Sequence, residues 1–166
     1  MGFFDSLFDK REKIDYYQIK RNFYFVATSQ RLKFPEQFGS INAERYRADI
    51  VAVFAAYMDT KEKFKHIYAT YGEDIIDEWD RNTEIIDFDT KGITIPACRK
   101  AYKQYGQIIS TKLNNHVNAT NVDILAKAIC DAHHVKADAA KLNAISMDIQ
   151  VMVDIIDATF EKFRFV

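Results

Sequence analysis

The stretch that most constrains the fold runs from residue 43 to residue 71. Asn42 can cap a helix at its start, Gly72 can end it, and no Pro or Gly falls between them. At 1.5 Å per residue this helix would be about 43 Å long, so we expect the other elements to pack along it. Thr60 is the one polar interruption in an apolar stripe at helical spacing, which comprises Tyr46, Ile50, Val53, Tyr57, Phe64, Ile67 and Tyr71.

A second long stripe lies at the end of the chain and predicts a helix over residues 137–163. Two long helices with matching apolar faces are natural partners, in either a parallel or an antiparallel arrangement. The positions of this second stripe, apolar except for Thr159, again step by threes and fours: Leu142, Ile145, Ile149, Met152, Ile156, Thr159 and Phe163.

Shorter helices are expected between and before these two. Pro96 suits the first turn of one of them, Gly106 inside it indicates close packing by a neighbour, and Thr120 with Asp123 suggests a helix cap. An Asp-to-Gly turn at residues 89–92 favours a small β-hairpin, although a continued helix competes there. The shorter helices are predicted over residues 11–32, a stretch ending near residue 82, residues 96–113 and residues 120–130.

The composition is that of an ordinary globular protein, with 48% apolar and 28% charged residues. We predict an all-α, single-domain helical bundle over residues 1–166. It would have five to six helices, two long ones packed together, and one small β-hairpin near residues 85–95. The longest apolar run, Ile50–Met58, is nine residues, which predicts no transmembrane segment. The two cysteines form no disulfide framework, so we expect a reducing, cytoplasmic location.

Charge is unevenly distributed along the chain. The whole protein has a net charge of −1, which argues against nucleic-acid binding. Residues 73–89, here called the acidic stretch, contain eight acids and one Arg, a net charge of −7. Such a field can steer a basic protein partner. Alternatively, the stretch is a solvated face neutralised by Lys61, Lys63 and Lys65 or by Arg99, Lys100 and Lys103. The predicted partner-binding residues are Asp74, Asp77, Glu78, Asp80 and Glu84.

The first nine residues form a short amphipathic segment. Its apolar residues precede Lys10, Arg11 and Lys13, an order typical of a weak contact with a membrane surface. The competing interpretation is that these rings plug one end of the helical core. The residues concerned are Phe3, Phe4, Leu7 and Phe8.

One cluster has the residue types that bind metals: Cys130, Asp131, His133 and His134. The spacing of a known zinc or di-iron motif is absent. We favour the interpretation that Cys130 is a small buried group and that both histidines lie at a helix C-terminus, and a metal site is the alternative. No phosphate loop, dinucleotide turn or serine elbow is present, so we predict no catalytic residues and no cofactor.

These patterns favour a non-catalytic protein-binding module, such as an immunity protein, an inhibitor or an adaptor. It would dock a basic partner through the acidic stretch. A peripheral membrane protein anchored by its N-terminal segment is the first alternative, and a metal-dependent helical-bundle enzyme is the second. No family motif is recognised in these residues.

Overall fold

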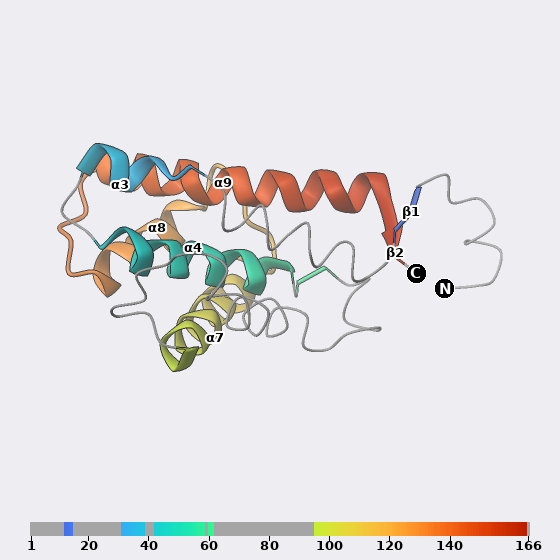
Figure 1. The fold of residues 1–166 in the computed structure, drawn as a ribbon, viewed down its shortest axis with the longest axis horizontal. Helices are drawn as coiled ribbons and strands as arrows, with labels where there is room; N and C mark the ends of the chain where they lie inside the picture. Colours follow the sequence, from blue (N-terminus) through green and yellow to red (C-terminus); the bar gives the residue numbers. More distant parts are fainter. Residues whose placement is uncertain (1–11, 15–30, 39–41, 59, 62–94, 166) are drawn as a thin grey trace.

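A computed structural model describes residues 12–14, 31–38, 42–58, 60–61 and 95–165 (Figure 1). These residues confirm the predicted all-α class: they form a bundle of helices with one very short sheet. The helices are α3 (Lys33–Phe38), α4 (Ala43–Met58), α7 (Ile95–Lys112), α8 (Asp123–Ala132) and α9 (Ala139–Lys162); the strands are β1 (Glu12–Ile14) and β2 (Phe163–Phe165).

Helix α4 lies at the centre of this bundle. Its start is capped as predicted, because the Asn42 side-chain oxygen accepts the Arg45 amide hydrogen over 2.9 Å. Every residue from Ala48 to Met58 is buried, so the second half of α4 is enclosed on all sides. The nine-residue apolar run Ile50–Met58 is therefore the middle of the core.

The prediction of one helix over residues 43–71 is wrong, because α4 ends at Met58. Both the backbone amide and the hydroxyl of Thr60 donate to the Tyr57 carbonyl, at 3.0 and 2.7 Å, and the Lys61 amide donates to the Met58 carbonyl at 3.0 Å. These short-range bonds satisfy the last carbonyls of the helix and close it. Thr60, the polar interruption in the apolar stripe, thus marks the end of the helix. Residues 62–71 lie outside the described residues.

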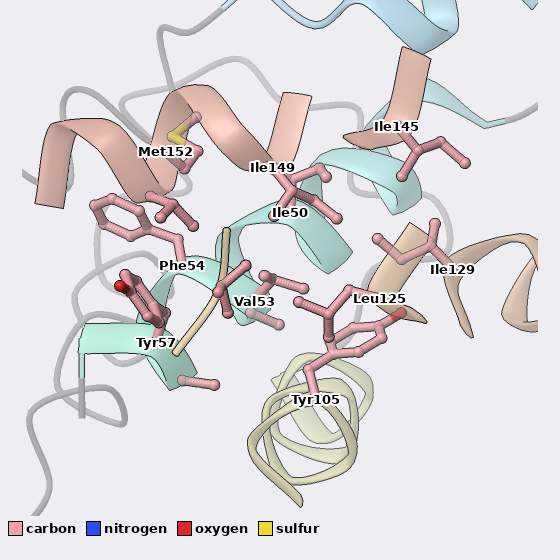
Figure 2. Packing of buried hydrophobic residues seen from close by; sticks show 14 of the residues in the cluster. Ile50, Val53, Phe54, Tyr57, Tyr105, Leu125, Ile129, Ile145, Ile149 and Met152 are labelled. Atoms are coloured by element: carbon pink, nitrogen blue, oxygen red, sulfur yellow. The ribbon is translucent and has the colours of Figure 1, made fainter. Parts of the chain in front are cut away.

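Helix α9 occupies almost the whole predicted range and runs beside α4 in the same direction (Figure 1). Tyr46 near the start of α4 bonds to Asp148, and Tyr57 near its end bonds to Asp157, so the two helices are parallel. The most extensive packing of α4, however, is against α7, which crosses it. Figure 2 shows side chains from α4, α7, α8 and α9 in the shared core, among them Val53, Tyr105, Leu125 and Ile149.

Gly106 confirms the predicted close approach on α7. A Cβ atom at this position would lie 3.7 Å from the Cβ of Ala56 on α4, which is ordinary van der Waals contact. Pro96 lies in the first turn of α7, also as predicted, because its missing amide hydrogen is not needed there.

The predicted cap of α8 by Thr120 and Asp123 is wrong. Val122 occupies the N-cap position with a helical backbone and no side-chain cap. The Thr120 hydroxyl donates instead to the Asn118 side chain at 2.6 Å. The Asp123 carboxylate accepts a 2.7 Å hydrogen bond from the Ser146 hydroxyl on α9. It therefore connects α8 to α9 and does not cap the start of α8.

Strands β1 and β2 pair in parallel, with Glu12 opposite Phe163. The predicted helix over residues 11–32 is therefore wrong at its start, where β1 lies. Residues 85–94 of the predicted hairpin lie outside the described residues, and Ile95, expected in its second strand, is the first residue of α7.

Candidate functional site

A buried group of polar side chains surrounds Tyr46 where α3, α4, α7, α9 and the end of α8 meet. We call it the Tyr46 network; its members are Tyr46, Asp49, Tyr105, His133 and Asp148. Asp49 and Asp148 are only 8% and 3% exposed. A buried carboxylate is very costly unless donors or cations surround it, so the partners of these two groups explain why they are tolerated.

Asp148 on α9 accepts three hydrogen bonds. Its Oδ1 atom accepts the Lys33 amide hydrogen at 2.7 Å, and its Oδ2 atom accepts the Phe34 amide at 3.0 Å and the Tyr46 hydroxyl at 2.8 Å. The two amides belong to the first turn of α3, where backbone donors have no partner within the helix. Asp148 therefore caps α3 from a helix more than a hundred residues away in the chain.

Burial controls the protonation of this part of the network. Burial raises the pKa of the Asp148 carboxyl above its usual value, while the Lys33 and Phe34 amides and the Tyr46 hydroxyl pull it down. Burial, followed by the charge of Asp148, raises the pKa of the Tyr46 phenol far above its usual value. Tyr46 consequently stays a neutral hydrogen-bond donor.

The second carboxylate, Asp49 on α4, contacts two further elements. Its Oδ1 atom accepts the Tyr105 hydroxyl of α7 at 3.0 Å, and its Oδ2 atom lies 2.5 Å from Nε2 of His133. The His133 side chain is 4% exposed, and its backbone amide donates to the last carbonyls of α8. Burial and the Asp49 charge raise the pKa of Tyr105 well above its usual value.

An edge-on ring contact connects Tyr46, which bonds to Asp148, with His133, which bonds to Asp49. The Tyr46 and His133 rings lie 6.2 Å apart, centroid to centroid, in a T-shaped arrangement. An Asp–His pair is also the arrangement that orients a general base in many enzymes. Here the bonds of Asp49 and Asp148 join α3, α4, α7, α9 and the end of α8 to one another, so their evident effect is to fix the relative positions of these elements.

A second polar cluster lies at the other end of α4. The Lys61 ammonium forms an ion pair with Asp157 on α9, donates to the Tyr57 hydroxyl at 2.9 Å and lies 4.3 Å from the centre of the Tyr57 ring. Burial alone would lower the pKa of Lys61, but its bonds to Asp157 and Tyr57 raise it above its usual value. Among the described residues, the ion pair of Lys61 is with Asp157 on α9.

The four residues with metal-binding side chains are not brought together. Cys130 is buried in the core, and His133 bonds to Asp49. Asp131 and His134 are exposed, and His134 adopts a left-handed backbone conformation with φ of 54°. Within the part of the chain that the structure describes, which includes all four, no group of three or more His, Cys, Asp or Glu is placed to hold a metal ion.

The other predicted site residues stay predictions. The acidic stretch, with Asp74, Asp77, Glu78, Asp80 and Glu84, lies outside the described residues, as do Lys63, Lys65 and the N-terminal Phe3, Phe4, Leu7 and Phe8. On α7, Arg99 is half-buried, and Lys100 and Lys103 are exposed.

The Tyr46 network was not predicted from the sequence, although two acidic residues inside apolar stripes indicate it. Asp49 lies three residues after Tyr46 and four before Val53, which puts it on the apolar face of its helix. Asp148 holds the same relation to its neighbours on α9, because it lies three residues after Ile145 and four before Met152. An acid inside an apolar stripe indicates a buried carboxylate that needs donors, but spacing alone does not name the donors.

The chain matches no protein-family model, no curated protein and no solved structure. Among the described helices, none is long and apolar enough to cross a membrane. Its function is therefore inferred from its own residues.

Proposed function

We propose that this protein is a non-catalytic protein-binding module that docks a basic partner through the acidic stretch. One observation supports this above all others. Residues 73–89 contain eight acids and one Arg, a net charge of −7, in a chain whose total net charge is −1. Because the rest of the chain is net basic, the net negative charge is concentrated in this one stretch of the sequence.

A concentrated negative field favours encounter with a positively charged surface and disfavours an acidic one. The classes of protein that work in this way include immunity proteins, inhibitors and adaptors, which act by covering part of a partner. We also propose a cytoplasmic location, which is supported by the free thiol of Cys130 and by the presence of only two cysteines in the sequence.

The described residues support this proposal indirectly. The buried carboxylates of Asp49 and Asp148 are engaged by donors from other helices, and Lys61 is paired with Asp157. These charged groups stabilise contacts between helices. The acidic stretch is thus a better candidate for partner recognition than the ionisable groups of the core.

The proposal is tested with the triple variant Asp74→Lys, Asp77→Lys and Glu78→Lys. The wild-type protein is first used to isolate its partner from the native host, and binding kinetics are then measured at low and high salt. We expect the triple variant to lose the partner while keeping its helical circular-dichroism spectrum. For the wild type, the association rate should fall steeply with added salt and the dissociation rate should change less.

A matched control makes the same charge change elsewhere: Asp131→Lys, Asp154→Lys and Glu161→Lys, at exposed positions of α8 and α9. This control should bind nearly as fast as the wild type, because its new charges lie outside the acidic stretch. Equal binding by the two triple variants, or binding without salt dependence, would reject the proposal.

A further inference from the structure

We draw no further inference here: the strongest candidate, the buried cluster of Asp49, Tyr105 and His133 where α4, α7 and the end of α8 meet, belongs to the site already described, and its hydrogen bonds join residues of the chain to one another without indicating a ligand.

Discussion

The hydroxyl of Tyr46 on α4 donates a 2.8 Å hydrogen bond to the Asp148 carboxylate on α9, across 102 positions of the chain. Both residues are buried, and the same carboxylate accepts the first two amides of α3. One side chain therefore fixes three helices relative to one another. A carboxylate with several donors in a low-dielectric interior is stabilised by each of them, so the contribution of each bond depends on the others.

We expect Tyr46→Phe to lower the free energy of unfolding by about 1–3 kcal/mol, because it leaves the buried Asp148 carboxylate one donor short. Urea unfolding of Tyr46→Phe, Asp148→Asn and the double variant gives the coupling between the two residues. The double variant should lose less stability than the sum of the single variants, by about 0.5 kcal/mol or more. Asp154 is an exposed residue on α9, the helix that carries Asp148. A second cycle that combines Tyr46→Phe with Asp154→Asn should therefore give additive losses of stability. Additivity in both cycles would mean that the Tyr46–Asp148 bond contributes nothing specific.

The raised pKa of Asp148 predicts a pH dependence of stability. Between the ordinary value of 3.8 and the raised value in the folded protein, the folded state binds more protons than the unfolded chain. The contribution of Asp148 to the free energy of unfolding must therefore fall as the pH rises through this window. The stability difference between wild type and Asp148→Asn, measured by urea unfolding from about pH 3 to about pH 7, should decrease and then level off. A difference that grows with pH would show that the three donors, rather than burial, dominate the pKa.

Val53→Asp should destabilise the protein by about 4 kcal/mol or more, because it puts a carboxylate into the centre of the α4 core. Val53 is 1% exposed and contributes to the cluster shown in Figure 2. Ile124→Asp is the control, since Ile124 is 40% exposed in the first turn of α8. Its thermal unfolding temperature should stay within a few degrees of wild type. Similar unfolding temperatures for the two variants would contradict the central position of α4.

Gly106→Ala should stabilise the protein by about 0.5–1 kcal/mol, because glycine is a poor helix former and the unfolded chain loses entropy when it is replaced. The added methyl group would meet the Ala56 Cβ at 3.7 Å, a distance that requires no rearrangement. Gly106→Val adds two further carbon atoms at the same crossing and should be less stable than Gly106→Ala. A loss of stability in the alanine variant, measured by urea unfolding, would show that α7 and α4 cannot tolerate any added volume there.

Some local signals predicted the local structure correctly, whereas the predicted cap by Thr120 and Asp123 was wrong. The Asn42 cap, the Pro96 start of α7 and the extent of α9 each depend on residues within a turn or two of one another. The apolar stripe resumes at Phe64, so periodicity predicts that the helix continues through Thr60. The hydroxyl and amide of Thr60 instead close the helix. Periodicity indicates which face of a helix is apolar. It does not indicate where a polar side chain takes the place of the next helical backbone hydrogen bond.

The candidate site was harder to predict because its bonds connect distant parts of the chain. Asp49 meets His133 across 84 positions, and Tyr57 meets Asp157 across 100. The direction of α4 against α9 could not be predicted from the sequence, because two matching apolar stripes fit either direction. The pairing of Tyr46 with Asp148 and of Tyr57 with Asp157 shows that the helices are parallel.

The parallel arrangement of α4 and α9 has a consequence for the nascent chain. Two neighbouring parallel helices cannot be joined by a short hairpin, and here about a hundred residues separate the partners Tyr46 and Asp148. At ribosomal speeds of about 5–20 residues per second, α4 would leave the ribosome roughly 5–20 s before the α9 surface that covers it. The side of the apolar segment Ile50–Met58 that faces α9 therefore lacks this cover in the growing polypeptide until residues 139–162 have been synthesised. Because α7 is synthesised before α9, the side of α4 that packs on α7 can be covered earlier than the side that packs on α9.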